Sequence, residues 1–324
     1  TIKMQPVRMV WRHKGAAYEL NLIDTPGHVD FTYEVSRALA AVEGALLLVD
    51  ATQGVQAQTI ANLHLALEQK IIVIPVINKI DLPSADIKKA EQELVELLGV
   101  SPDEILKISA KTGAGVESLL ETIVEKIPPP SVFRSFSEGG LRALIFDSIY
   151  DPYQGTIAHV RIVEGKIKAH EKIFFLASGE MAEVAEVGIF APQRAPHPEI
   201  SEGEIGYIAT GIKGLEHGRV GDTIGSSPQV APLPGYHEPM PMVFASVFPE
   251  NQDEYEQLCD AIKKLKLNDA ALVFEPEVGL ASLGRGFRVG FLGMLHIEII
   301  SERLSREYEL SLVFSNPSVA FHVY

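Results

Sequence analysis

The stretch that decides the fold is YELNLIDTPGH, residues 18–28. Apolar and polar residues alternate in it and then give way to an apolar pair before Asp24, which predicts a strand that enters a buried sheet. A carboxylate at the end of such a strand can hold Mg²⁺, usually through a water, beside the phosphates of a nucleotide. Gly27 allows the backbone to come close, so that its N–H can face a terminal phosphate, and His28 follows at the mouth of this site.

An amphipathic helix is expected to follow this turn from about Asp30. Its apolar positions fall on one face: Phe31, Val35, Ala38, Leu39 and Val42. A segment that senses a terminal phosphate and ends in a helix is a switch. The spacing Asp-x-x-Gly alone also fits an ordinary turn between a strand and a helix, so its interpretation depends on two motifs further along the chain.

The second motif is NKID, residues 78–81, which directly follows the aliphatic run at 71–77. Strand ends in open α/β sheets form a ligand crevice. Asp81 in this crevice can accept hydrogen bonds from N1–H and the exocyclic amine of guanine, whereas adenine would leave a desolvated carboxylate unpaired. The stem of Lys79 can cover the base, and Asn78 can tie its loop to the neighbouring loop. A polar turn that begins the next helix is the alternative interpretation.

The third motif is Ser109-Ala110-Lys111, again at the end of a predicted strand. Its small residue allows a backbone N–H to reach the carbonyl oxygen of guanine. The tripeptide carries little information alone, but it follows the other two motifs in the right order and place. Together the three loops predict a guanine nucleotide site.

Three regions of different composition follow one another along the chain. Residues 1–128 alternate aliphatic strands with amphipathic helices, which indicates a parallel sheet covered on both faces, and thus an α/β nucleotide-binding domain. Proline-rich linkers are predicted at 129–140 and 228–238. The short β-rich runs of 141–227 are typical of a small antiparallel barrel. Residues 239–324 have the order β-α-β-β-α-β, which predicts an α+β ferredoxin-like domain. Strands of the barrel are expected at 141–149, 156–163, 172–176, 182–189 and 205–209.

Composition narrows the class of protein. The 324 residues, of which 46% are hydrophobic, can bury more than one core. The formal net charge of −15 argues against a protein that coats nucleic acid with its whole surface, but not against local contacts. The single cysteine, Cys259, excludes an internal disulfide and fits a reducing compartment. Because no apolar run is long enough to cross a bilayer, we expect a soluble cytoplasmic protein.

The three motifs in this order resemble the GTPase superfamily, and DTPGHVDF at 24–31 resembles the translational GTPases in particular. VGDTI at 220–224 is similar to domain II of elongation factors. GRGFRVGFLGMLHIE at 284–298 is similar to domain III of the elongation factor G group. Residues 34–59 and NKIDLPSAD at 78–86 resemble the LepA family, also called elongation factor 4, and the resemblance covers nearly the whole chain. The TypA family fits less well.

This resemblance implies a GTPase translation factor that binds GTP or GDP with Mg²⁺ and acts on elongating ribosomes, where hydrolysis drives its release. It implies that His28 orients the attacking water and that Thr1 and Asp24 hold Mg²⁺. The residues expected to contact the nucleotide are Asp24, Gly27, Asn78, Lys79, Asp81, Ser109, Ala110 and Lys111. Ribosomal RNA and proteins are the expected partners, with tRNA as a further one whose position the factor alters, for example by back-translocation. No DNA and no integral membrane span are expected, and we expect a monomer.

The sequence departs from this family at one point, because it contains no G-x-x-x-x-G-K-[ST] motif. In the family this P-loop, which cradles the α- and β-phosphates, lies upstream of the position of Thr1. The chain also lacks an initiating Met. We therefore expect these residues to be the middle of a longer factor, and to bind and hydrolyse nucleotide poorly by themselves.

Two hypotheses from different classes remain open. In the first the protein is a ribosome-dependent GTPase, with a TypA-like enzyme as a close variant. In the second these residues are a non-catalytic module that supplies only architecture and ribosome contacts. A P-loop upstream of Thr1 would support the first. A GTPase that activates sulfate is set aside, because it should lack the ferredoxin-like domain.

Overall fold

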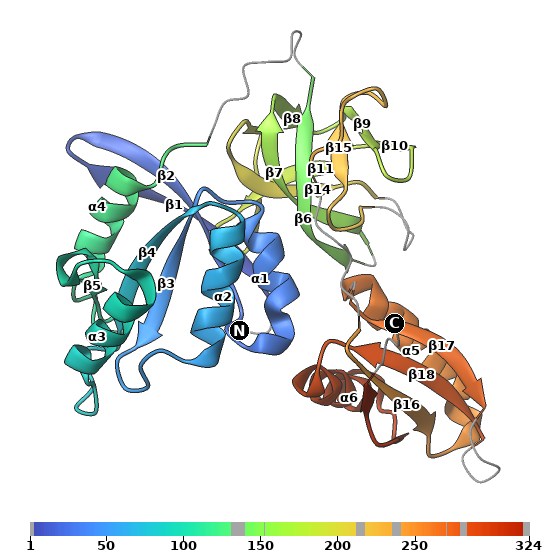
Figure 1. Cartoon of the computed structure of the whole chain (residues 1–324). Helices are drawn as coiled ribbons and strands as arrows, with labels where there is room; N and C mark the ends of the chain where they lie inside the picture. The colour runs from blue at the N-terminus through green and yellow to red at the C-terminus, as the bar shows by residue number, and fades with distance from the viewer. Residues whose placement is uncertain are drawn as a thin grey trace, which may run out of the picture.

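The computed structural model describes residues 3–130, 140–151, 153–211, 218–234, 241–269, 271–278 and 284–319. They form three successive regions, coloured from blue through green and yellow to red in Figure 1. Thr1, a predicted Mg²⁺ ligand, lies outside the described residues. No helix within these ranges combines the length and the apolar character that crossing a membrane requires.

A three-stranded parallel sheet forms the centre of the first region, as its aliphatic runs predict. Its strand order is β3 (Gly44–Asp50), β4 (Ile72–Asn78) and β5 (Leu106–Lys107). Leu47, Val49 and Ile77 pack with α3 (Ile87–Leu98) in one apolar cluster. Ile74 and Val76 pack with α4 (Val116–Lys126) in another. Along β4, Ile74 and Val76 point to one face of the sheet and Ile77 points to the other, so the two helices cover opposite faces.

The strand before Asp24 does not enter this sheet, and that part of the sequence prediction is wrong. β2 (Ala16–Asp24) instead pairs antiparallel with β1 (Gln5–His13), and within the described residues it has no other strand partner. Leu22 keeps 42% of its surface exposed. The alternating run thus belongs to a two-stranded ribbon that stays partly exposed along its length, and not to a strand buried on both faces.

The switch-like helix is present as predicted. A 3₁₀ turn at Val29–Phe31 leads into α1 (Thr32–Leu39). Its buried side chains include Phe31, Val35, Ala38 and Leu39, four of the five predicted positions. Val35 and Leu39 pack against α2 (Ala57–Glu68) in one cluster with Ala66, whereas Ala38 lies in another cluster with Phe146 of the second region.

The second region is a β-barrel whose eight-stranded antiparallel sheet runs β10-β9-β15-β6-β7-β14-β11-β12. A two-stranded sheet of β8 and β13 shares its core, because Ile167 and Ile200 lie in one cluster with Ile145 and Val160. The bounds are β6 (Arg142–Asp151), β7 (Gly155–Glu164), β8 (Lys166–Lys168), β9 (Lys172–Phe175), β10 (Glu180–Glu183), β11 (Glu186–Phe190), β12 (Arg194–Pro196), β13 (Glu199–Ser201), β14 (Ile205–Ala209) and β15 (Thr223–Gly225).

One predicted barrel strand is divided in two. The pattern at 182–189 predicts a single strand, but β10 and β11 are separated at Val184-Ala185. The Val184 N–H donates to the carbonyl of Glu171, whereas the next N–H, of Ala185, donates to that of Ala209. The chain therefore changes its hydrogen-bonding neighbour here, which an apolar pattern cannot reveal.

The third region has the predicted ferredoxin-like order. It comprises β16 (Val243–Pro249), α5 (Tyr255–Asn268), β17 (Val273–Val278), β18 (Arg285–Phe291), α6 (Met294–Tyr308) and β19 (Leu312–Phe314), with β20 (Ser318–Val319) also on β16. The sheet order is β17-β18-β16-β19, and both helices pack on one face. A Cβ at Gly286 would collide with the Phe248 ring and the Val247 carbonyl, so the close approach of β18 to β16 requires glycine there.

Candidate functional site

Asn78 joins the loops that follow β4 and β5. Its Oδ1 accepts hydrogen bonds from the N–H of Lys79 (2.8 Å) and from the N–H of Ala110 (3.0 Å). The two strands are parallel neighbours, so their carboxyl ends meet at one edge of the sheet. The structure therefore brings the two predicted base-binding motifs together. The Ala110 N–H, predicted to face guanine, is used here to hold the loops.

Asp81 presents a carboxylate to solvent at this edge. The Ser109 side chain hydrogen-bonds to it, and this bond is the main reason that the pKa of Asp81 lies below its usual value. Desolvation opposes the shift, and a backbone hydrogen bond at Asp81 and the charge of Lys111 support it. Ser109 itself is fully buried, and its Oγ accepts from the Thr112 N–H (3.2 Å). Asp81 is thus an ionised, fixed acceptor, the state that can receive two N–H donors from guanine.

Lys79 connects this edge to β3. Its backbone is left-handed, with φ at 64°, and its Nζ lies 2.6 Å from Oδ2 of Asp50. Burial acts to raise the pKa of Asp50, but hydrogen bonds from Lys79 and Thr52 outweigh it and lower the pKa. The ion pair orients the Lys79 stem. Sequence reasoning missed this partner, although an Asp at the end of the neighbouring strand was a usable signal.

The predicted phosphate-side residues lie at the end of β2, at Asp24, and in the turn after it, at Gly27 and His28. The space beside the Cα of Gly27 is open, because a Cβ built there would meet no atom within 4 Å. The His28 side chain is 43% exposed, and its Nδ1 accepts a hydrogen bond from the Asp30 N–H (3.2 Å). Asp24 is an exposed residue, and carboxylate oxygens are ligands that suit Mg²⁺. These features fit a phosphate with its metal ion.

The helix α1 carries a buried charge cluster that sequence reasoning missed. Arg37 NH1 lies 3.2 Å from Oδ1 of Asp147 on β6, and Lys3 Nζ and His159 Nδ1 each lie 3.5 Å from its Oδ2. Burial would raise the pKa of Asp147, but the charges of Lys3, Arg37 and His159 lower it. Burial lowers the pKa of His159 to about 4. The cluster fixes the switch helix to the barrel.

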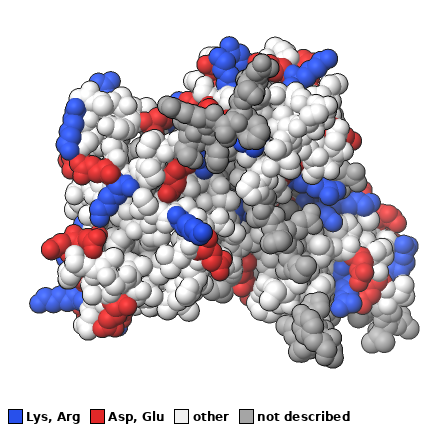
Figure 2. All heavy atoms as spheres, turned by 45° about the horizontal axis from the view of Figure 1, so that its top comes forward, with Lys and Arg blue, Asp and Glu red and all other residues white. Residues whose placement is uncertain are grey.

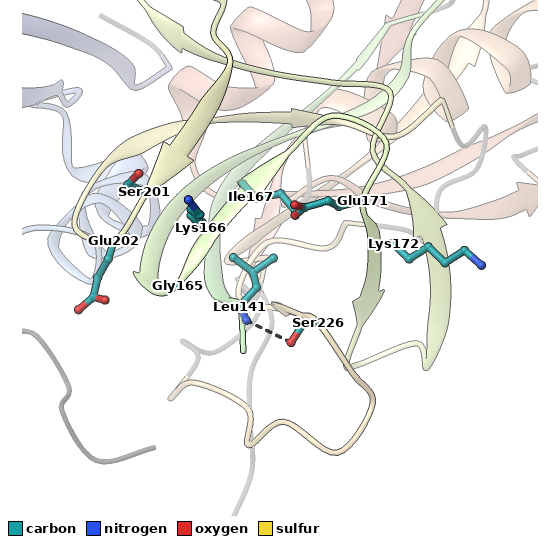
Figure 3. Close-up of a pocket in the computed structure, with 9 residues that line it drawn as sticks. All are labelled: Leu141, Gly165, Lys166, Ile167, Glu171, Lys172, Ser201, Glu202 and Ser226. Atoms are coloured by element: carbon teal, nitrogen blue, oxygen red, sulfur yellow. Dashed lines mark hydrogen bonds between the residues drawn. The ribbon is translucent and has the colours of Figure 1, made fainter. Parts of the chain in front are cut away.

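A pocket of about 590 Å³ lies in the barrel, away from these motifs (Figure 3). Leu141, Ile167, Glu171 and Ser226 are among its lining residues, and the Leu141 N–H donates to Ser226 Oγ (3.1 Å). None of the predicted site residues lines it. Its lining carries charges of both signs and no motif, so the strand-end loops remain the candidate site.

Comparisons with known proteins match this chain to elongation factors. The family model described as "Elongation factor Tu GTP binding domain" matches residues 1–129, and "Elongation factor Tu domain 2" matches residues 155–225. Curated relatives match the entire chain. Elongation factor 4 of Rubrobacter xylanophilus is 54% identical over 325 residues, which are 53% of its own length. Elongation factor 4 of Clavibacter michiganensis is 52% identical, and the chain covers 52% of its length. Elongation factor 4 of Aquifex aeolicus is 51% identical, and the chain covers 54% of its length. The chain spans about half the length of these relatives.

Proposed function

Because this chain belongs to the translational GTPases of the elongation factor 4 (LepA) family, we propose that the full-length protein hydrolyses GTP on elongating ribosomes. Hydrolysis then drives its release. The observation that carries the proposal is the ionised Asp81 carboxylate, held by Ser109 in loops that Asn78 ties together. An acceptor-only group in this place selects guanine, since adenine offers it no donor pair.

The base site uses side chains that the fold already fixes. Asp81 accepts N1–H and the exocyclic amine of guanine, and the Lys79 stem, oriented by Asp50, covers the base. Asn78 keeps the loops of β4 and β5 together, so that Ser109, Ala110 and Lys111 close the other side. Preorganisation of this kind reduces the ordering that binding would otherwise cost.

On the phosphate side, Asp24 and Thr1 would hold Mg²⁺, and the Gly27 N–H would face the γ-phosphate. A metal ion bound there would supply positive charge to the phosphate oxygens as charge develops on them. His28 accepts the Asp30 N–H at Nδ1, so the neutral ring carries its proton on Nε2. A ring in this state orients a water through its Nε2–H and does not itself take the water's proton.

The proposed partner is the ribosome, with tRNA as a further contact whose position the factor changes. Figure 2 shows acidic and basic side chains interspersed over the viewed face of the described residues, without one continuous basic surface. With a net charge of −15, contacts to RNA are therefore expected to be local. A monomeric, cytoplasmic protein completes the proposal.

The test compares wild-type full-length protein with His28→Ala, and uses His64→Ala, an exposed histidine on α2, as the matched control. GTP turnover is measured with and without ribosomes, and GDP affinity by equilibrium titration. We expect His28→Ala to retain GDP affinity and to lose roughly 100-fold or more of the ribosome-stimulated turnover. Unchanged turnover would remove His28 from its role. A wild-type protein without any ribosome-stimulated turnover would instead support the non-catalytic module.

A further inference from the structure

Asp30 contacts both the proposed catalytic histidine and the third region. Its N–H donates to His28 Nδ1 (3.2 Å), and its Oδ1 lies 3.6 Å from the same nitrogen. Its Oδ2 accepts a hydrogen bond from the N–H of Leu295 (3.0 Å), in the first turn of α6. Figure 1 shows α6 at the side of the third region that faces the N-terminal region. This hydrogen bond joins two residues that are 265 positions apart in the chain, and one of them, Asp30, is itself hydrogen-bonded to His28.

The start of α6 is built to receive this carboxylate. The N–H groups of the first helical turn have no partner within their own helix, and the N-cap residue Gly293 has no side chain to supply one. Asp30 takes that place from another region, where the positive end of the helix also favours its charge. The Asp30 side chain is only 15% exposed, so water screens this contact weakly.

Gly293 makes room for the contact. A Cβ built at this position would overlap the carboxylate atoms of Asp30. Its backbone is extended, with φ at −177°, a conformation that any residue adopts. The backbone conformation therefore does not require glycine at position 293. The reason for glycine there is that Asp30 occupies the space that a side chain would fill.

We propose that Asp30 is a positioning residue for His28, and that α6 holds it in place. The inference deepens the proposed function and rests on it. With the carboxylate held by Leu295, the Asp30 N–H keeps His28 Nδ1 as an acceptor and the ring in one orientation. If the third region moves away, Asp30 loses this anchor, and its N–H no longer holds His28 in one orientation. The position of the third region thereby controls hydrolysis.

A double-mutant cycle in the full-length protein tests this coupling. Asp30→Ala removes the carboxylate, and Gly293→Ala displaces it without touching the switch segment. We expect each to lower ribosome-stimulated kcat by roughly 10- to 100-fold, with KM for GTP and GDP affinity unchanged, because a misplaced group affects the chemical step. The double variant should be no slower than Asp30→Ala, since no carboxylate remains to be displaced. Asp30→Asn retains the acceptor oxygen and should restore most of the activity.

The control is Met294→Ala, which changes the exposed neighbour of the contact and should leave kcat unchanged. Three outcomes would each overturn the inference and leave the proposed function standing. They are equal losses of kcat and GDP affinity in the variants, additive effects in the cycle, and a normal kcat in Asp30→Ala. A wild-type protein without GTPase activity would contradict the proposed function alone. NMR spectra of the protein with ¹⁵N-labelled histidine then give a separate readout, because they report which ring nitrogen of His28 carries the proton. Comparison with His28→Ala assigns its signals. The Nε2–H form should dominate in the wild type and lose this dominance in Gly293→Ala, and identical spectra would overturn the inference.

Discussion

Mild acid should loosen the barrel through one residue, His159 on β7. Its side chain is 8% exposed, and neither ring nitrogen has a hydrogen-bond partner among the residues that the structure describes. Burial lowers the pKa of His159 from 6.5 to about 4, against the attraction of Asp147, and the charges of Lys3, Arg194 and Arg37 act in the same direction as burial. The folded protein therefore holds this ring neutral.

The sign and size of the effect follow from this difference. In the unfolded chain the histidine takes up its proton near pH 6.5, whereas in the folded chain it does so only near pH 4. Between these values the unfolded state binds more protons, so the free energy of unfolding falls as the pH falls. Each pKa unit corresponds to about 1.4 kcal/mol, so the loss between pH 7 and pH 5 should be about 2 kcal/mol. Above pH 6.5 the contribution is fully present.

Hydrogen exchange of the amides of β6 and β7 measures this locally, because the protein has several regions that need not unfold together. The free energy of opening, corrected for intrinsic exchange rates, is compared at pH 7 and pH 5. His159→Gln should remove about 2 kcal/mol of the pH-dependent loss, whereas the exposed control His64→Gln should not. Equal pH dependence in wild type and His159→Gln would refute the reasoning. So would a loss confined to other strands.

Three further predictions concern the site and the third region. Asp81→Asn should shift base preference from guanine toward xanthine, because the 2-carbonyl of xanthine needs a hydrogen-bond donor. Competition between GDP and XDP measures this preference. Retained guanine selectivity would remove Asp81 from the site. Asn78→Ala leaves the N–H groups of Lys79 and Ala110 without their acceptor, so GDP affinity should fall by roughly 10- to 100-fold in equilibrium titration, and unchanged affinity would contradict the tie. Gly286→Ala should destabilise the third region by about 1–3 kcal/mol in denaturant unfolding, because its Cβ meets the Phe248 ring, and an unchanged midpoint would contradict that close packing.

Local features of this protein could be predicted from sequence, and long-range ones could not. The loops at 78–81 and 109–111 were placed correctly because an aliphatic run, its end and the polar residues after it are neighbours in the chain. The ferredoxin-like order followed from the same kind of pattern. The partner of β2 was missed, since an alternating run fits a hairpin as well as a sheet.

The contacts that join the regions left no trace in the local pattern. Arg37 falls on a helix whose charged positions look solvated, yet it meets Asp147 across 110 positions. Asp30 looks like a residue of the first helical turn and reaches Leu295. Such pairs depend on how finished regions pack, and no periodicity in one segment encodes its partner in another.

The place of β15 in the barrel has a consequence for synthesis. β15 hydrogen-bonds to β6 on one side and to β9 on the other, although both of these strands precede it by many residues. A nascent chain that has emerged to the end of β6 must wait for roughly 70 further residues, or about 4–15 s at usual elongation rates. During this interval one edge of β6 is unpaired, and an unpaired edge is a template for other chains. Slow codons between Asp151 and Thr223 would therefore favour aggregation more than slow codons after Gly225, where β15 already covers this edge.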